Sequence, residues 1–212
     1  MKLHRCNSKK GMIQEMKIEI RADSVLIDGY VNAVERDSKV LRNANGPFVE
    51  KIKAGAFQRS LDRAKRTGYD VKVLLNHDYS KELTSTRDTN TKIYEDSIGL
   101  RCKCEIRDAE VIKKAREGKL VGWSFGFIPI RDSWEKESDM SHRELRELEL
   151  KEVSILDDRK NPAYSGTSIE TRDDDLIEVR SMDDRMETVD LTERKTNNYK
   201  FHNRILATRA GV

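Results

Sequence analysis

The chain has 212 residues, with 41 Lys and Arg against 38 Asp and Glu, which gives a net charge of +3. Charged residues make up 37% of the chain and hydrophobic residues 36%, so we expect one domain of about 150 residues with less compact extensions. The near balance of charge argues against specific nucleic-acid binding, and no apolar run approaches the ~20 residues of a membrane helix. Three cysteines, an odd number, favour a reducing, cytoplasmic setting over a disulfide framework.

Three regions of the chain differ in composition. Residues 1–15 are basic and lack the apolar core of a secretory signal, so we expect a flexible arm. Apolar patterning and turn signals are dense over residues 16–168, which is the expected folded domain. Residues 169–212 are acidic in their first half and basic in their second, a pattern typical of a charged, disordered tail.

The spacing of apolar residues in the domain predicts mainly β-structure. Alternating or β-rich runs predict strands at residues 16–20, 24–34, 71–75, 100–106, 121–130 and 148–156, with a break near Asp28 and Gly29. Strands and helices do not alternate regularly, which argues against a doubly wound sheet. We therefore expect an α+β fold built on an antiparallel β-barrel or sandwich, with short helices packed outside.

Two short helices are predicted between these strands. Helical spacing predicts the first over residues 57–64, with Gly68 as its stop signal. The second is predicted over residues 109–117, with Asp108 as its N-cap. The stretch 135–149 is very polar, and we expect it to be a loop.

Side chains two residues apart along a strand share a face. By this rule, each of three strand segments has one polar residue on its apolar face. They are His77, which continues the face of Val71, Val73 and Leu75; Ser124, which shares its face with Gly126, Ile128 and Ile130; and Glu152, which continues the face of Leu148 and Leu150. A buried carboxylate is costly unless it is paired, and a histidine is its cheapest partner. The other nitrogen of that histidine can hold a serine hydroxyl, which would complete a nucleophile, a base and an orienting acid.

Each of the three residues also has a purely structural interpretation. His77 can be a satisfied core histidine, Ser124 a small packing residue, and Glu152 an edge or bulge residue. Val153 and Ile155 are apolar on the other face, which leaves the inward side of Glu152 open.

A series of short motifs follows along the domain. They are Gly55-Ala56-Phe57, Leu75-Asn76-His77-Asp78, Asp96-Ser97-Ile98-Gly99-Leu100, Trp123-Ser124-Phe125-Gly126-Phe127, Leu150-Lys151-Glu152-Val153-Ser154-Ile155-Leu156 and Asn161-Pro162-Ala163. This order resembles the prohead (capsid maturation) protease family of tailed bacteriophages over about residues 18–165. The resemblance implies a fold similar to herpesvirus assemblin, a β-barrel ringed by helices. It implies a serine endopeptidase that acts inside the prohead in the host cytoplasm.

The same resemblance implies partners and residue roles. The substrate would be the scaffold or the scaffolding segment of the major capsid protein, and such enzymes often cut themselves. Ser124 matches the family's nucleophile, His77 its general base and Glu152 its third member. Herpesvirus relatives use a second histidine at the third position, so His142 is the competing candidate. Those relatives act as dimers, which makes a homodimer possible here.

Parts of the sequence also resemble other chemistries, and one other class of function fits the same fold. The motif Gly122 to Gly126 also matches G-x-S-x-G, but that nucleophile elbow needs a helix directly after the serine. Cys102 and Cys104 lack the further ligands of a zinc site, and we expect neither a metal nor a cofactor. The alternative function is a non-catalytic capsid scaffold or assembly protein that keeps the fold without the chemistry.

Overall fold

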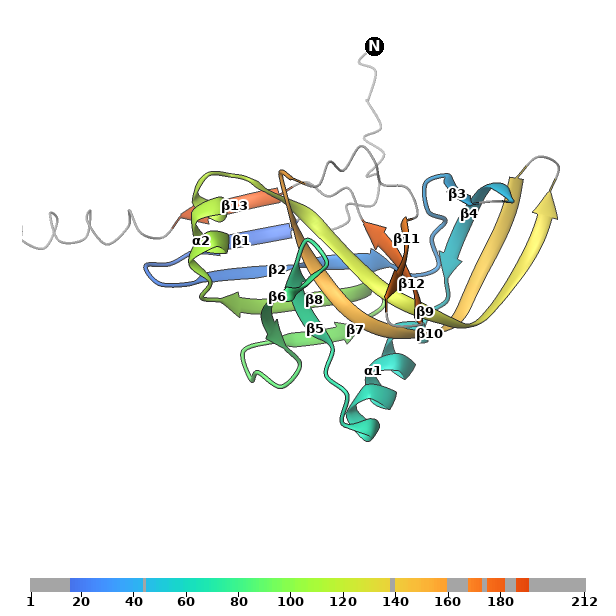
Figure 1. The fold of residues 1–212 in the computed structure, drawn as a ribbon, viewed down its shortest axis with the longest axis horizontal. Coiled ribbons are helices and arrows are strands. Elements are labelled where there is room, and N and C mark those ends of the chain that lie inside the picture. The colour runs from blue at the N-terminus through green and yellow to red at the C-terminus, as the bar shows by residue number, and fades with distance from the viewer. Residues whose placement is uncertain are drawn as a thin grey trace, which may run out of the picture.

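The computed structural model describes residues 16–43, 45–137, 140–159, 168–172, 175–181 and 186–190. These residues form thirteen strands and two helices, so the mainly β character is confirmed (Figure 1). The strands lie in two sheets that are not closed into a barrel, and the barrel expected from the sequence is therefore not confirmed. No helix within the described ranges is long and apolar enough to cross a membrane.

The first sheet has five strands and carries much of the apolar core. In spatial order it consists of β13 (Met186–Asp190), β1 (Met16–Ile20), β2 (Val25–Ala33), β8 (Gly99–Ile106) and β7 (Lys92–Glu95). Buried residues alternate with more exposed ones along β1 and most of β8, as the sequence predicts.

The second sheet has eight strands and carries the residues singled out above. Its main path is β11 (Ser168–Arg172), β12 (Asp175–Ser181), β9 (Leu120–Glu137), β10 (Met140–Asp157), β4 (Gly46–Ile52) and β3 (Leu41–Asn43). Off this path, β5 (Lys72–Leu75) pairs with β10, and β6 (Asp78–Ser85) pairs with β5.

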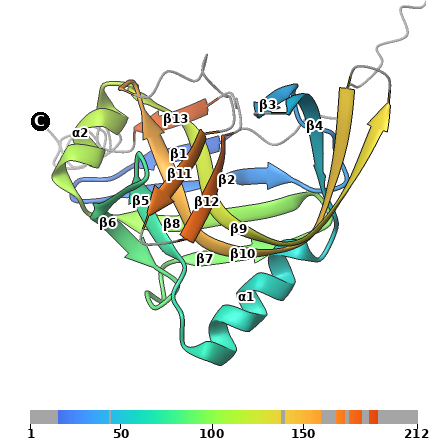
Figure 2. The ribbon, with the colours of Figure 1, turned by 45° about the vertical axis from the view of Figure 1, so that its right-hand side comes forward.

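The prediction of a loop over residues 135–149 is wrong. The described residues of this stretch, 135–137 and 140–149, belong to a long antiparallel pair of strands in which β9 and β10 pair from Glu137 and Met140 down to Leu120 and Asp157. The outer part of β10 also pairs in parallel with β4, as Figure 2 shows. The polar side chains of this stretch find partners on the neighbouring strands, so the low hydrophobicity does not prevent strand formation.

Both predicted helices are confirmed. Helix α1 (Ala56–Thr67) ends at Gly68, whose φ of 72° is the left-handed conformation that glycine supplies most easily. Helix α2 (Ala109–Arg116) begins after Asp108, whose side chain accepts a hydrogen bond of 3.0 Å from the backbone N–H of Val111.

Large aromatic residues of β9 fill the core beneath the second sheet. Trp123, Phe125 and Phe127 are fully buried on one face of β9. Phe57 of α1 meets Phe125 edge to face, with ring centroids 5.4 Å apart. This packing fixes β9 against α1 and leaves the opposite face of β9, which carries Ser124, for polar groups.

Part of the region expected to be a charged tail pairs with the two sheets. β12 runs antiparallel to β9, and β13 runs parallel to β1. The expected arm at residues 1–15 and the end of the tail at 191–212 lie outside the described residues. The domain boundaries stay a prediction.

Candidate active site

A tight turn at the end of β5 aims His77. Asn76 and His77 both have left-handed backbones, with φ of 56° and 63°. Two such residues end the alternation of β5, so His77 does not continue the apolar face of Leu75 as the spacing predicts. The turn is held by hydrogen bonds of 2.9 Å from the N–H of Asn76 to the carbonyl of Ile155 and of 3.0 Å from the N–H of Asp157 to the side chain of Asn76.

A β-bulge in β10 places Glu152. Leu150 pairs with Phe127, but Glu152 pairs with the very next residue of β9, Gly126, so β10 holds one extra residue, Lys151. Directly paired residues share a face, and Glu152 therefore lies on the face opposite Leu150. The predicted shared face of Leu150 and Glu152 is thus wrong, because the bulge reverses the alternation.

His77 and Glu152 are in direct contact. Nδ1 of His77 lies 2.7 Å from Oε1 of Glu152. Glu152 is 1% exposed and His77 is 7% exposed, so the pair is almost fully removed from water. Because the contact occupies Nδ1, a proton exchanged with a further group would pass through Nε2.

Ser154 is a member of the cluster that sequence reasoning missed. Its Oγ donates a hydrogen bond of 2.7 Å to Oε2 of Glu152 and accepts one of 3.0 Å from the backbone N–H of His77. It lies two residues after Glu152 on the same face of β10, and this spacing was the available signal. Both carboxylate oxygens of Glu152 are thereby fixed.

Ser124 faces this cluster from β9. Its register partner across the hairpin is Ser154, so the two serines share the face that carries Glu152. Ser124 is fully buried, and its Oγ donates a hydrogen bond of 2.7 Å to the backbone carbonyl of Arg180 in β12. Among the hydrogen bonds between described residues, none joins Ser124 to His77. The structure therefore brings Ser124 beside the pair with its hydroxyl directed to β12.

Gly126 makes room for the acid. A Cβ atom at Gly126 would lie 2.5 Å from Oε1 of Glu152 and 3.2 Å from Ile177. The glycine beside Ser124 is thus required by the close approach of the Glu152 carboxylate. Its backbone is not left-handed, so space alone accounts for this requirement.

His142, the competing third member, is elsewhere. It lies at the outer end of the hairpin, where it pairs with Glu135 and Val49. Its side chain is 40% exposed, and Nε2 lies 3.7 Å from the carboxylate of Glu137. Glu152, and not His142, contacts His77.

A buried network of charges lies beside the cluster and was also missed by sequence reasoning. Arg143 donates to Glu50 at 2.9 Å and to Glu178 at 2.6 Å, and Arg180 donates to Glu50 at 2.9 Å through two nitrogens. Burial opposes the charge of Glu178, but the hydrogen bond from Arg143 and the charges of both arginines outweigh it and lower the pKa of that carboxyl. No periodic signal pointed to this network, because its members come from three strands that are distant in sequence.

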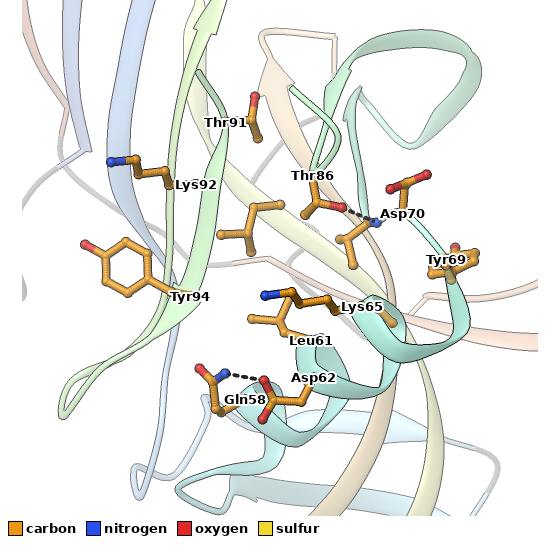
Figure 3. A pocket seen from close by; sticks show the side chains of 14 residues that line it. Gln58, Leu61, Asp62, Lys65, Tyr69, Asp70, Thr86, Thr91, Lys92 and Tyr94 are labelled. Carbon is orange, nitrogen blue, oxygen red and sulfur yellow. Dashed lines mark hydrogen bonds between the residues drawn. The ribbon is translucent and has the colours of Figure 1, made fainter. Parts of the chain in front are cut away.

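A pocket of about 610 Å³ lies between α1, the loop after it and β7, away from this cluster (Figure 3). Its labelled polar side chains include Gln58 and Asp62, which bond to each other at 2.9 Å, and Thr86, which accepts from the backbone of Val71 at 3.1 Å. None of His77, Ser124 and Glu152 lines it. The pocket therefore lacks the histidine, serine and acid that the cluster brings together.

Within the described part of the chain, no group of three or more His, Cys, Asp or Glu residues could hold a metal ion. Cys102 and Cys104 are buried in β8. A hydrogen bond with Cys104, together with burial, raises the pKa of the Cys102 thiol well above its usual value. A thiol held neutral in this way is a packing residue and a poor nucleophile.

The cluster has the parts of an acyl-transfer site. A carboxylate orients an imidazole, and a serine hydroxyl stands on the same face of the hairpin. Catalytic hydrogen bonds are often unformed before substrate binds, so the direction of the Ser124 hydroxyl does not exclude this role.

Comparison with known proteins agrees with this chemistry. A family model described as caudovirus prohead serine protease matches residues 12–182. No curated protein and no solved structure matches the chain.

Proposed function

Because the chain belongs to the caudovirus prohead serine protease family, we propose that Ser124, His77 and Glu152 form its catalytic triad. Membership makes the chain a phage capsid-maturation serine protease in general terms and implies a location within the phage capsid in the host cell. The substrates are the scaffold or the scaffolding segment of the major capsid protein, and the chain itself.

The proposed reaction is acyl transfer. Ser124 Oγ attacks the carbonyl carbon of the scissile bond while Nε2 of His77 takes the hydroxyl proton. His77 then gives this proton to the leaving amine, and water hydrolyses the acyl-enzyme by the same route. Glu152, bonded to Nδ1, holds the imidazole in the required tautomer and stabilises its charged form.

One observation carries the proposal: the 2.7 Å contact between Nδ1 of His77 and Oε1 of Glu152, two residues 75 positions apart. A buried imidazole and carboxylate are expensive to hold together, and a packed apolar pair would serve stability as well. Glu152 receives a second hydrogen bond from Ser154, which fixes its orientation. Such support favours a role for the imidazole over a purely structural one.

The proposal is tested by co-expressing the chain with the major capsid protein encoded beside it and weighing all products by intact mass spectrometry. Wild type is expected to cut the capsid protein or its scaffold at defined bonds and to trim its own C-terminal region. Ser124→Ala is expected to cut nothing, since loss of a triad nucleophile costs about 10⁶-fold in kcat. Ser133→Ala, farther along β9, is the matched control and keeps activity.

Cleavage by Ser124→Ala at the wild-type bonds would refute the triad. Uncut partners with both proteins, in particles that still assemble, would instead favour a non-catalytic scaffold.

A further inference from the structure

β12 occupies the edge of β9 beside Ser124. Arg180 pairs with Phe125, and Ser181 pairs with Ser124, in an antiparallel arrangement. The carbonyl of Arg180 accepts the hydrogen bond of 2.7 Å from Ser124 Oγ. Extended peptides are commonly bound by addition to a strand edge, and β12 is bound in this way with one of its carbonyls at the nucleophile.

The side chain of Arg180 is received by a specific acidic site. Its Nε and Nη2 donate to Oε1 and Oε2 of Glu50, both at 2.9 Å, which is the two-pronged geometry of an arginine and a carboxylate. The guanidinium carbon lies 5.2 Å from the centre of the Phe127 ring. Lysine fits both contacts less well than arginine does. Its ammonium is a single point of charge, so it cannot bond to both carboxylate oxygens in parallel or lie flat on the ring.

A second charge on β12 is recognised two residues earlier. Oε2 of Glu178 accepts from Nη1 of Arg143 at 2.6 Å. Arg143 in turn bonds to Asp132 at 2.6 Å and to Glu50 at 2.9 Å. The residues that would remain without β12 are Glu50, Asp132 and Arg143, two acids and one base, so the site alone favours an arriving cation.

No part of the Ser124 side chain reaches solvent. Ile177 of β12 also lies over the neighbouring Gly126, 3.2 Å from the position of its missing Cβ. A peptide substrate therefore cannot reach Ser124 while β12 stays in place. Ser124 donates its hydroxyl hydrogen bond to the carbonyl oxygen of Arg180. This contact holds β12 in place and is not the first step of a hydrolysis of β12.

We propose that β12 holds the place of a substrate strand and that Glu50 is the specificity-determining residue for an arginine at the position of Arg180. The substrate class is an extended peptide with an acidic residue two positions before that arginine. β12 must leave the edge of β9 before such a peptide binds, so the same contacts restrain the enzyme. This inference rests on the proposed function, since it takes Ser124 as the nucleophile.

Peptide binding tests the recognition without any chemistry. The full chain carrying Ser124→Ala and Arg180→Ala is titrated, by fluorescence anisotropy, with labelled peptides of the sequence of residues 175–181. The arginine of the peptide is kept, or replaced by lysine or by citrulline, which has nearly the same shape and no charge. We expect the arginine peptide to bind about tenfold tighter than either, a difference of about 1.4 kcal/mol. Equal affinities would overturn the proposal.

Variants of Glu50 test its part in the selection. Glu50→Gln is expected to remove most of the preference for arginine over citrulline, because only the bond to Glu178 within the strand remains, whereas Glu50→Asp keeps more of it. Glu117→Gln, an exposed acid at the end of α2, is the matched control and keeps the full preference. Thermal unfolding of each variant identifies any that fails to fold. If a Glu50 variant does not fold, the peptide series measured on the chain that keeps Glu50 decides whether arginine is preferred.

Activity of the full chain tests the restraint. Arg180→Ala is expected to cleave the arginine peptide about tenfold faster than wild type at low peptide concentration, because β12 is held less tightly. Arg36→Ala, an exposed arginine in the loop after β2, is the matched control and matches wild type. Equal rates for wild type and Arg180→Ala would contradict the displacement of β12. If no variant cleaves any peptide while the arginine preference in binding persists, the proposed function fails and the recognition by Glu50 stands.

Discussion

Ser154 supports two groups of the proposed triad at once. It donates to the Glu152 carboxylate and accepts from the backbone N–H of His77. Gly126 contributes through its lack of a side chain, since a Cβ atom there would clash with the same carboxylate. Neither residue takes part in the proton transfer, and both hold Glu152 in the position that the proposed chemistry needs.

Ser154→Ala is expected to lower kcat by about tenfold with little change in KM, since one hydrogen bond of about 1.4 kcal/mol is lost from the orienting acid. Steady-state kinetics on a cleaved peptide measures this effect. Ser60→Ala is the matched control, because Ser60 is also buried and its hydroxyl accepts from the backbone of Leu150 at 2.7 Å. Both variants lose stability, but a fall of kcat in Ser60→Ala of the same size would show that the effect is structural.

Gly126→Ala is expected to push the Glu152 carboxylate away from His77 and to reduce kcat/KM by at least about 100-fold, since a misplacement near 1 Å carries such a cost. Gly29→Ala is its control: a Cβ there would meet Trp123 at 2.9 Å, in the core on the face of β9 opposite Ser124. Circular dichroism and kinetics are measured on both. Full activity in a folded Gly126→Ala would contradict the assigned position of Glu152.

Two irregular elements, the turn after β5 and the bulge in β10, bring these residues together. The sequence predicted both helices because their signals, a capping aspartate and a terminal glycine, are local. It named His77, Ser124 and Glu152 through alternation and through a family resemblance. It could not foresee the bulge at Lys151, because the extra residue is defined only by the partner strand. The strands within residues 135–149 were not predicted, because a stretch so polar is typical of a loop. Its polar residues find their partners on β4 and β9, which the sequence pattern does not show.

The turn provides a prediction for the element that aims His77. Asn76→Val is expected to lower both stability and activity, because a β-branched residue fits poorly at the φ of 56° found there. Asn76→Gly fits that backbone, and loses only the hydrogen bond to the Asp157 N–H, so its activity stays closer to wild type. Thermal unfolding and peptide kinetics compare the two. Equal behaviour of both variants would show that backbone conformation at residue 76 does not matter.

Ion pairs join the separate elements into one molecule. Asp157, at the end of β10, bonds to Arg159 at 2.7 Å and to Lys114 of α2 at 3.0 Å. Burial disfavours its charge, but the hydrogen bonds from Arg159 and the other donors outweigh this and hold the pKa of Asp157 well below its usual value. The pKa of Glu178, which ties β12 to β10, is lowered for a similar reason. Both carboxylates therefore stabilise the fold only while they are ionised.

Stability is expected to fall in acid. The pKa of Asp157 is lower in the folded than in the unfolded protein. Its carboxylate therefore makes its full contribution to the free energy of unfolding above about pH 4, and this contribution is lost as the pH drops toward the folded pKa. Urea unfolding at several pH values measures this loss. Asp157→Asn starts with a lower midpoint at pH 7 and shows a smaller decline below pH 4. Asp23→Asn, an exposed control, declines as wild type does. A decline in Asp157→Asn as steep as in wild type would contradict the role of this carboxylate.

The identity of the nucleophile is the central claim, because Ser154 stands directly opposite Ser124 and also contacts the His77 and Glu152 pair. The most direct measurement is fluorophosphonate labelling of the full chain and of its Arg180→Ala form, followed by peptide mapping of the adduct by mass spectrometry. We predict a single adduct on Ser124, formed faster in Arg180→Ala and absent from Ser124→Ala. An adduct on Ser154, or no adduct on Ser124 in either form, would contradict the account.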